Sequence, residues 1–391
     1  MVPFEKALEI VLQNTRFTGT VRVPLSDTVN RALAEDIFSD IDMPPFDKSA
    51  VDGYACRMED VSTGSLRVME TIPAGIIPQK TIGRGECSKI MTGAMLPSGA
   101  DGVIMVEDTE PAGDQMIRFV PGTNAHNICY RAENIKTADR VLEKGTIIRP
   151  AHIAALASVG ATHPQVARLP RVAVLSTGDE LVEPGDKPAP AQIRNSNASQ
   201  LMAQLTLVPA AATYKGIASD QETALYNSVA KAFDNNDGVL LTGGVSMGEF
   251  DLVPEILKNV GVEILFKSVA IQPGRPTLFG VKGDQFVFGL PGNPVSSFVL
   301  FEIMVKPFLL KMMGSFSVSP PLILSMGTTY QRKKSPRKTM IPVRIDGDQV
   351  FPVDYHGSAH INAYIHANGI LAIEPWITEL KRGEQVHVRP L

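Results

Sequence analysis

The sequence predicts a multidomain α/β plus β protein, with a central parallel α/β domain and β-rich domains around it. The chain has 391 residues, enough for about two to four domains. From Arg171 onward, short apolar segments alternate with helical patterns, which is typical of βαβ units and a parallel sheet. From Asp42 to about Arg149, and again after Ser317, short strand-like segments are punctuated by Gly and Pro, which indicates β-rich domains.

The composition excludes several classes of protein. Hydrophobic residues make up 44% and charged residues 20% of the chain, as in ordinary soluble globular proteins. A net charge of −4 and a pI of about 6.0 argue against general binding of nucleic acid or anionic membranes. Cys56, Cys87 and Cys129 lie too far apart for a zinc pair or a disulfide framework, which indicates a reducing compartment. With no visible signal peptide or membrane-spanning apolar window, we expect a cytoplasmic protein.

The first part of the chain is expected to contain two helices and then a β-rich region. From Pro3 to about Thr15, apolar residues recur at helical spacing, and Pro3 suits the first turn. A second helix is expected from Ser26 to Ala34, with Ser26 as its N-cap. The segment DMPPFDKSAVDGYA, which begins at Asp42, has no period and is expected to be a loop that enters short strands.

The α/β series begins with RVAVLSTGDEL, a strand that runs from Arg171 into a turn. A helix follows, with Asn195 or Ser196 as its N-cap. The next strand, helix and strand are ATYKGIASD, QETALYNSVAKAF and DGVLLTGG, and a later long apolar helix ends at Gly314. This alternation places the carboxyl ends of the parallel strands, where ligands bind in open α/β sheets, at one edge.

Turn-forming and polar residues follow the predicted strands at this edge. The segments are STGDE, GIASD, TGGVSMGEFD and LPGNPVSS. Each one alone is typical of an ordinary turn, but four in consecutive βα units favour a ligand site. The amides of the two glycine loops and the hydroxyls of Thr242, Ser246 and Ser296 can hold phosphate oxygens. Arg275, in QPGRP, can add a bidentate contact to an anion.

Three carboxylates lie among these anion-binding groups. They are Glu180, Asp220 and Asp251. Acidic side chains repel a bound phosphate at short range unless a cation or a proton lies between them. We therefore expect these three residues either to hold Mg²⁺ or to share protons with the ligand.

Several familiar sites are absent from the sequence. It contains no GxxxxGK[ST] P-loop, no GxGxxG after a strand and no HExxH. His356, His360 and His366 fall close together and are interpreted either as metal ligands or as ordinary surface or ligand-edge histidines. The basic run RKKSPRK, from Arg332 to Lys338, is interpreted as an exposed hairpin loop.

Six motifs occur in an order and spacing that identify a family. They are DMPPFDKSAVDGYA, IMTGAMLPSGADGVIMVED, VAVLSTGDELVEPG, LLTGGVSMGEFD, QPGRPTLFG and LPGNPVSS. Over essentially its full length, the chain resembles the molybdopterin molybdenumtransferases of the MoeA family and is similar to the C-terminal domain of gephyrin. The resemblance implies a central molybdopterin-binding α/β domain, a β-rich insertion-like domain, a small linking domain and a C-terminal β-barrel-like domain.

The resemblance also implies the domain boundaries and the assembly. The α/β domain comprises 1–17 and 168–316, the linking domain 18–41 and 139–167, the β-rich domain 42–138, and the C-terminal domain 317–391. Family members insert molybdate into adenylylated molybdopterin with a divalent cation such as Mg²⁺, and release AMP. They are homodimers in which the DGYA-bearing domain of one subunit completes the site of the other. A molybdopterin adenylyltransferase and molybdoenzyme maturation proteins are the partners that this activity suggests.

The family motifs assign roles to residues of this chain. The resemblance implies catalytic roles for Asp52, Thr92, Glu180, Asp220, Asp251 and Arg275, with Glu180, Asp220 and Asp251 as metal ligands. Together with the loop residues above, the binding set is Thr242, Gly243, Gly244, Ser246, Gly248, Gln272, Pro291, Gly292, Asn293, Pro294, Ser296 and Ser358. Gln272 occupies a position where members often carry a basic residue, so this chain lacks one cation there.

One stretch departs from the family pattern N-[IV]-R-x-x-G-E-D. This chain has Cys129 in place of the Arg, Ala132 in place of the Gly and Asn134 in place of the Asp. Arg131 is close enough in sequence to substitute for the missing Arg. These substitutions leave open a catalytically degenerate pterin-binding or scaffold protein. A molybdopterin adenylyltransferase, which uses a similar α/β module, is a second alternative, although the extra β domains and the DGYA and PGNP motifs argue against it. The sequence also leaves molybdate and tungstate as alternative substrates.

Overall fold

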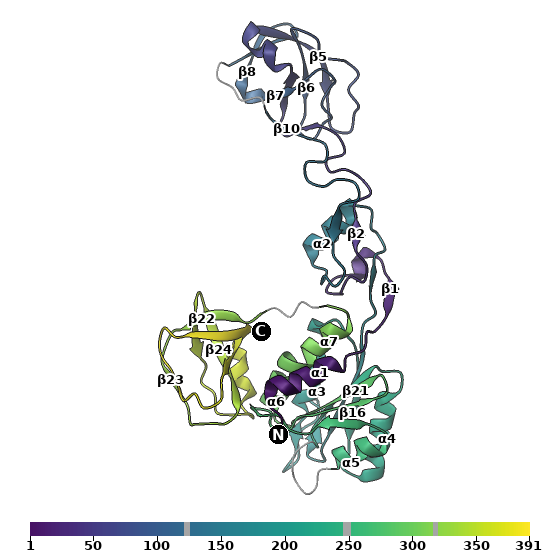
Figure 1. Cartoon of the computed structure of the whole chain (residues 1–391), viewed down its shortest axis with the longest axis vertical. Helices are drawn as coiled ribbons and strands as arrows, with labels where there is room; N and C mark the ends of the chain where they lie inside the picture. Colours follow the sequence, from purple (N-terminus) through teal and green to yellow (C-terminus); the bar gives the residue numbers. More distant parts are fainter. Residues whose placement is uncertain (121–125, 245–251, 316–319) are drawn as a thin grey trace. The chain divides into compact units, whose positions relative to one another are not determined.

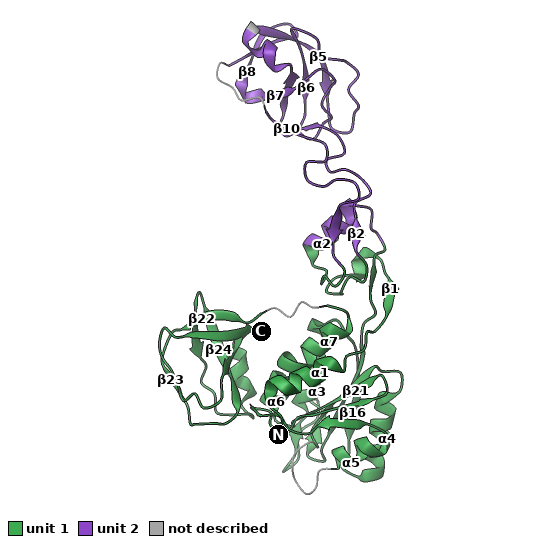
Figure 2. Cartoon of the chain, in the orientation of Figure 1, with its two compact units in different colours: residues 1–35, 144–150, 163–391 green, residues 36–143, 151–162 purple. Residues whose placement is uncertain are grey.

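The computed structural model describes residues 1–120, 126–244, 252–315 and 320–391. The chain forms two compact units, coloured green and purple in Figure 2. Unit 1 comprises residues 1–35, 144–150 and 163–391, and unit 2 comprises residues 36–143 and 151–162. Three candidate site residues, Ser246, Gly248 and Asp251, lie outside the described residues.

A six-stranded sheet forms the centre of unit 1 (Figure 1). In spatial order its strands are β16 (Ala211–Ala218), β13 (Arg171–Thr177), β17 (Gly238–Thr242), β21 (Gln285–Leu290), β20 (Leu278–Lys282) and β18 (Glu263–Phe266). The first four strands are parallel, as the βαβ pattern predicts. β20 pairs antiparallel with β21 and with β18 at one edge. The sequence therefore predicts the parallel core of this sheet correctly.

Helices cover both faces of the sheet, which explains why the central strands β13 and β17 are mostly apolar. Val172, Val174 and Leu240 belong to one core cluster with the first set of helices, and Ala173, Leu175 and Leu241 to another with the second set. The first set is α1 (Phe4–Gln13), α3 (Ser196–Leu207), α6 (Pro294–Leu300) and α7 (Lys306–Met312), and the second is α4 (Glu222–Phe233) and α5 (Val253–Asn259). Side chains alternate along a strand, so a strand buried on both faces needs an apolar residue at every position.

A closed barrel forms the C-terminal part of unit 1. Its strands pair in the order β24 (Lys338–Asp346), β25 (Gln349–Pro352), β22 (Leu322–Met326), β28 (Gln385–Pro390) and β26 (Gly369–Ile373), and β26 pairs back with β24. A short strand of the α/β part, β19 (Ile271–Gln272), pairs parallel with β24 and joins the two parts. Closure leaves no open edge in the ring, and the predicted barrel-like domain is confirmed.

Unit 2 contains a second six-stranded sheet. The strand order is β7 (Gly102–Met105), β4 (Gly53–Cys56), β6 (Glu86–Ile90), β5 (Ser65–Ile72), β9 (Met116–Phe119) and β8 (Thr109–Gly113). The Gly of the DGYA motif, Gly53, is required by packing, since a Cβ there would collide with the carbonyl oxygen of Ile104 on the neighbouring strand. The β-rich prediction for this region is confirmed.

The expected helix from Ser26 to Ala34 is wrong. Only a single 3₁₀ turn, Leu25–Asp27, forms there, and Asn30 adopts a left-handed conformation with φ of 65°. Ala32 and Leu33 instead pair through bridges with Ile147 and Val166, so contacts with remote segments override the local helical pattern. The other expected helices form, and none in the described ranges is both long and apolar enough to cross a membrane.

An ion pair holds the amino-terminal edge of the central sheet. Arg168 donates to both carboxylate oxygens of Asp237, at 2.8 and 2.9 Å, and the Arg171 N–H donates to the same carboxylate at 2.7 Å. Burial alone would raise the pKa of Asp237, but these hydrogen bonds lower it below its ordinary value of 3.8. Because the folded-state pKa is below the unfolded one, this carboxylate stabilises the fold above pH 4 and loses its effect as the pH falls through the folded pKa.

We predict that Asp237→Asn lowers the free energy of unfolding by about 2 kcal/mol at pH 7, because charged hydrogen bonds are lost. The deficit should shrink as the pH falls below 4, because the unfolded carboxylate binds a proton before the folded one does. Urea unfolding at pH 7 and pH 3 measures both values. Asp284→Asn is the control, because Asp284 is 90% exposed and pairs with Arg16 at 3.5 Å. A deficit of equal size at both pH values would contradict the assignment.

A second prediction concerns Ala132, whose φ of 60° lies in the left-handed region. A Cβ in this conformation costs about 1–2 kcal/mol, which exceeds the entropy that glycine loses on folding. Ala132→Gly should therefore stabilise unit 2 by about 0.5–1 kcal/mol, measured by hydrogen exchange of the β4 and β6 amides. Ala154→Gly, in the exposed middle of α2 (Pro150–Ser158), should destabilise it by about 1 kcal/mol. Destabilisation by both substitutions would refute the strain at Ala132.

Candidate functional site

Four strand ends meet at one edge of the central sheet. The register pairs Ser176 with Thr242, Thr177 with Ala218, and Thr242 with Leu290. The segments that follow these strands therefore begin side by side, as expected for the carboxyl edge of a parallel sheet. They carry Glu180, Asp220, Gly243 and Gly244, and the Pro291–Asn293 turn.

The glycine turn after β17 cannot carry a side chain. Gly243 and Gly244 have φ values of 90° and 60°, and a Cβ on Gly243 would collide with the carbonyl oxygen of Thr177. The turn therefore lies directly against the end of β13. The Thr177 hydroxyl is buried beside it and makes no hydrogen bond with the described residues. The structure thus provides a half-buried backbone turn and a buried hydroxyl without a described partner at this point of the edge.

Asn197 ties two of the four strand ends together. Its side chain is 8% exposed, and its Nδ2 donates to Thr242 Oγ1 and to the Gly292 carbonyl oxygen, each at 2.8 Å. Asn197 lies in the first turn of α3, whose N-cap Asn195 accepts from the Ala198 N–H. The sequence analysis missed Asn197, because an Asn beside an N-cap is typical of an ordinary helix start.

The acidic residues gather at the ends of β13 and β16. The Asp179 N–H donates to Asp220 at 3.4 Å, and the Asp220 N–H donates to Asp179 at 3.2 Å. Glu180 and Asp220 are exposed and form no ion pair with any described residue. Asp179 was missed because only Glu180 of the STGDE segment was selected. No three potential metal ligands converge within the described ranges, which leave out Asp251, so the metal roles stay predictions.

A cleft of about 640 Å³ opens between the α/β part of unit 1 and the barrel. Its lining includes six of the predicted site residues, namely Gln272, Arg275, Pro291, Asn293, Ser296 and Ser358. The structure therefore brings together residues that are up to 86 positions apart (Gln272 to Ser358). Gly292, between the lining residues Pro291 and Asn293, lies beside Gly243, so the glycine turn is close to this end of the cleft.

The cleft is lined by cations. Arg275, Arg332, Lys333, Lys334 and Arg337 contribute to its surface, and the described lining residues include no carboxylate. Arg337 donates to Gln272 Oε1 at 3.3 Å, so a cation from the barrel lies at the position where family members often carry their own. Residues 332–337 of the basic run form a loop, as expected, but the loop is not a hairpin, because β23 (Tyr330–Gln331) pairs with β27 (Glu379–Leu380) and not with β24. The loop lines the cleft. Such a surface attracts anions.

Neutral hydroxyls complete the lining. Burial, together with the neighbouring Tyr330, raises the pKa of Tyr355 to about 12. Its phenol therefore stays protonated at neutral pH and can donate a hydrogen bond. Ser296 and Ser358 add two further hydroxyls.

Direct contacts hold the two walls of the cleft together. Ile271 and Gln272 pair with Lys338 and Thr339 across the strands β19 and β24. The Val295 N–H donates to the Ser358 carbonyl oxygen at 3.1 Å, next to the PGNP loop. The geometry of the cleft therefore depends on both parts of unit 1.

In unit 2, the structure brings two candidate residues into contact. The Thr92 N–H and hydroxyl donate to Asp52 Oδ1 at 2.6 and 2.7 Å. These hydrogen bonds lower the pKa of Asp52, and the bond from the Thr92 N–H has the larger effect. Asp52 is therefore a carboxylate at neutral pH. Thr92 therefore holds the Asp52 carboxylate in place through two hydrogen bonds. The catalytic roles of both residues stay predictions.

The departures from the family pattern lie in the same unit. Cys129 is in the short strand β10 (Ile128–Cys129), paired with Lys48 of β3 (Lys48–Ser49). Arg131, the possible substitute for the missing Arg, donates through Nε to Asp42 at 2.7 Å. Its charge is therefore already engaged. The Asn134 N–H donates to the Met43 carbonyl oxygen, so this position supports the loop through its backbone.

The three histidines of the C-terminal part do not form a metal site with other described residues. The His356 and His360 rings stack with centroids 5.1 Å apart, and His356 lies 3.4 Å from Asp354. These contacts fit ordinary surface histidines.

Comparison with protein families covers nearly the whole chain. Residues 2–160 match the MoeA N-terminal region (domain I and II), residues 173–311 match a probable molybdopterin binding domain, and residues 328–391 match the MoeA C-terminal region (domain IV). Individual relatives and a solved structure also match this chain over nearly its full length.

The molybdopterin molybdenumtransferase of Staphylococcus aureus (strain Mu50) is 34% identical over 398 residues, covering 99% of this chain and 95% of that protein. The Staphylococcus epidermidis enzyme of the same name is 34% identical over 397 residues, with the same coverage. The crystal structure of a molybdopterin biosynthesis MoeA protein from Pyrococcus horikoshii matches with a TM-score of 0.87 and 30% identity over 100% of both chains. Full-length identity at this level confirms the resemblance, and the chain belongs to the MoeA family of molybdopterin molybdenumtransferases.

Proposed function

We propose that this protein acts in molybdenum cofactor biosynthesis by inserting molybdate into adenylylated molybdopterin, with release of AMP. The observation that carries the proposal is the cleft of about 640 Å³, which is lined by five cations and, among the described residues, no carboxylate. Molybdate is a tetrahedral dianion and requires such a surface. The cleft lies next to the strand ends of a domain that matches the probable molybdopterin binding family.

The cleft is the proposed binding site for the oxyanion. Arg275 is exposed, and its guanidinium makes no hydrogen bond with any described residue. It can therefore give both donors of its fork to one oxyanion. Arg337 supplies the charge that Gln272 lacks, and the hydroxyls of Ser358 and Tyr355 can donate to the remaining oxygens.

The glycine turn and its neighbours are the proposed site for the phosphate end of the pterin. The Gly243 N–H already donates to the Leu290 carbonyl oxygen, but the amide of Gly244 and the hydroxyls of Thr242 and Ser296 remain as donors at the carboxyl edge of the sheet. Gly292 and Asn293 belong to the next turn along this edge, and Pro294 begins α6 directly after it. Binding both anions in a fixed relative position can lower the barrier without a protein nucleophile.

The acidic end of the edge suits a magnesium ion. Glu180 and Asp220 are exposed carboxylates without ionic partners among the described residues, and Asp251 follows the glycine turn in sequence. Carboxylate oxygens are the ligands that Mg²⁺ prefers. When bound there, the ion would neutralise charge on the phosphates of the substrate. We further propose a homodimer in which Asp52 and Thr92 of a second copy complete the site.

The activity can be tested with purified protein, adenylylated molybdopterin, molybdate and Mg²⁺. AMP release and formation of active cofactor are expected, and Arg275→Gln should raise the KM for molybdate at least tenfold because a charged contact is lost. Arg344→Gln is the control, because Arg344 lies on the barrel and pairs with Asp346 at 2.8 Å. If the wild-type protein releases no AMP, the proposal fails. If the wild-type protein is active and Arg275→Gln has an unchanged KM for molybdate, the assignment of the oxyanion site fails.

A second candidate function is a protein that binds the pterin without turnover. The observation that favours it is the ion pair between Arg131 and Asp42, since Arg131 is then not free to replace the Arg missing at Cys129. The double substitution Cys129→Arg and Asn134→Asp discriminates the two functions. A large gain in a weak AMP-releasing activity would indicate a degenerate enzyme, whereas unchanged robust activity would support the first proposal.

We also predict that Asn197 positions the site. Asn197→Asp keeps the shape of the side chain but removes both N–H donors, which leaves the Gly292 carbonyl oxygen facing a carboxylate. The PGNP loop should shift, and kcat should fall about 10- to 100-fold, since small misplacements of bound groups have effects of this size. Ser199→Asp, on the exposed face of the same helix, controls for the added charge. A loss of thermal stability with unchanged kcat would show a purely structural role.

A further inference from the structure

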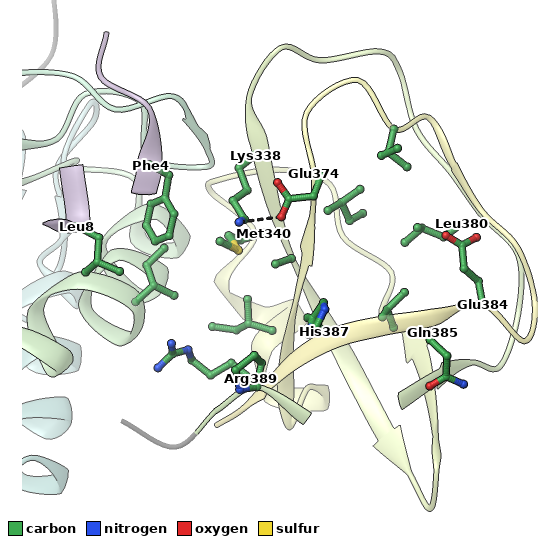
Figure 3. Close-up of a pocket in the computed structure, with 17 residues that line it drawn as sticks. Phe4, Leu8, Lys338, Met340, Glu374, Leu380, Glu384, Gln385, His387 and Arg389 are labelled. Carbon is green, nitrogen blue, oxygen red and sulfur yellow. Dashed lines mark ion pairs between the residues drawn. The ribbon is translucent and has the colours of Figure 1, made fainter. Parts of the chain in front are cut away.

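A second hollow in unit 1 lies between α1 and the barrel (Figure 3). Its volume is about 380 Å³, and its described lining shares only Met340 with the lining of the cationic cleft. Neither the sequence motifs nor the proposed reaction uses this groove. It is therefore a separate candidate for ligand binding.

Most side chains that line the groove are apolar. Phe4 and Leu8 of α1 lie on one side, and Met340 and Leu380 of the barrel lie on the other. Ile370 and Val386 of the barrel also line the groove. A groove lined in this way favours a small ligand with an apolar part that packs against these side chains. The volume also lies in the range of about 300–1,000 Å³ that is typical of small-molecule sites.

One of the two cations at the groove is already paired. Lys338 Nζ lies 2.7 Å from Glu5 and 2.8 Å from Glu374, and the second contact is drawn as a dashed line in Figure 3. Two carboxylates therefore neutralise this ammonium group. It offers no net charge to a ligand.

The other cation, Arg389, has no such partner. Its guanidinium makes no hydrogen bond or ion pair with any described residue, although the side chain is half-buried. Burial lowers the pKa of Arg389, and attraction by Glu302 opposes this effect. Glu302 is itself engaged, since its carboxylate accepts from Gln204 and from Lys306, each at 2.8 Å. Arg389 thus keeps all five N–H donors for a ligand.

The remaining charges limit the kind of anion. Glu374 and Glu384 also line the groove, and Glu5 lies close to it through Lys338. These carboxylates would repel a phosphate or another multiply charged anion at short range. A single carboxylate can accept both donors of the guanidinium fork with less repulsion.

We propose that this groove binds an amphipathic monocarboxylate, whose apolar chain packs on α1 and the barrel and whose carboxylate accepts hydrogen bonds from Arg389. Binding would remove the apolar walls from water and satisfy a half-buried charge. The proposal does not depend on molybdate insertion, because the groove and the cationic cleft use different side chains.

Isothermal titration of the full chain with decanoate tests the proposal, with decan-1-ol as the uncharged probe of the same length. Decanoate should bind the wild-type protein at least tenfold more tightly than decan-1-ol. Arg389→Gln should remove this difference, and Arg344→Gln, a matched loss of charge on the barrel, should retain it. Ala372→Leu, which fills part of the groove, should weaken both probes.

Three results would overturn the proposal. They are the absence of decanoate binding at millimolar concentration, equal binding of the two probes to the wild type, and an unchanged preference in Arg389→Gln. If Arg389→Gln does not fold, the comparison of the two probes on the wild type and on Ala372→Leu still decides the question.

Discussion

Parallel backbone pairing decides where the candidate ligand groups lie in this protein. β13 lies between β16 and β17, and β17 pairs in turn with β21. Adjacent strands are about 4.8 Å apart, so about 14 Å separates the ends of β16 and β21 along one edge. Acids follow β16 and β13, the glycine turn follows β17, and the cationic cleft begins after β21. Among the described residues, the edge therefore runs from a negative end to a positive end, in the order that the strand topology sets.

The positive end depends on tertiary contacts as well as on the sheet. Arg275 belongs to the α/β part, whereas Arg332 and Arg337 belong to the barrel. The pairing of β19 with β24 and the hydrogen bond from Val295 to Ser358 hold these two sets of cations on one cleft. Like charges repel, so the backbone contacts must offset the cost of gathering the cations in the absence of an anion. A bound oxyanion would remove that cost and stabilise the closed arrangement of the two parts.

The elements that the sequence predicts well have strong local patterns. Val239 to Leu241 is apolar at every position, and this pattern is typical of a strand buried on both faces. The Ser26 to Ala34 helix failed because pairing with Ile147 and Val166 overrides its periodicity. The charge of the run from Arg332 to Lys338 is evident from the sequence, but its place in the cleft is not. That place depends on the pairing of β24 with Gln272, about sixty positions earlier in the chain. Asn197 was missed for the same reason, since its two acceptors lie at the end of β17 and in the turn after β21, far away in the sequence.

Cys129 and Asn134, which depart from the family pattern in unit 2, take no part in the contact between Asp52 and Thr92. Both Thr92 donors bind Oδ1 of Asp52, and Oδ2 makes no hydrogen bond with the described residues. Asp52 is therefore charged and keeps one oxygen for a ligand, whatever residue occupies position 129 or 134. Arg131 is held by Asp42, so the cation lost at Cys129 is not replaced from this loop. Among the described cations, Arg337 of the barrel loop donates to Gln272, the position where family members often carry a basic residue. A neighbouring cation therefore lies at the departure in unit 1, whereas Arg131 is already paired with Asp42 at the departure in unit 2.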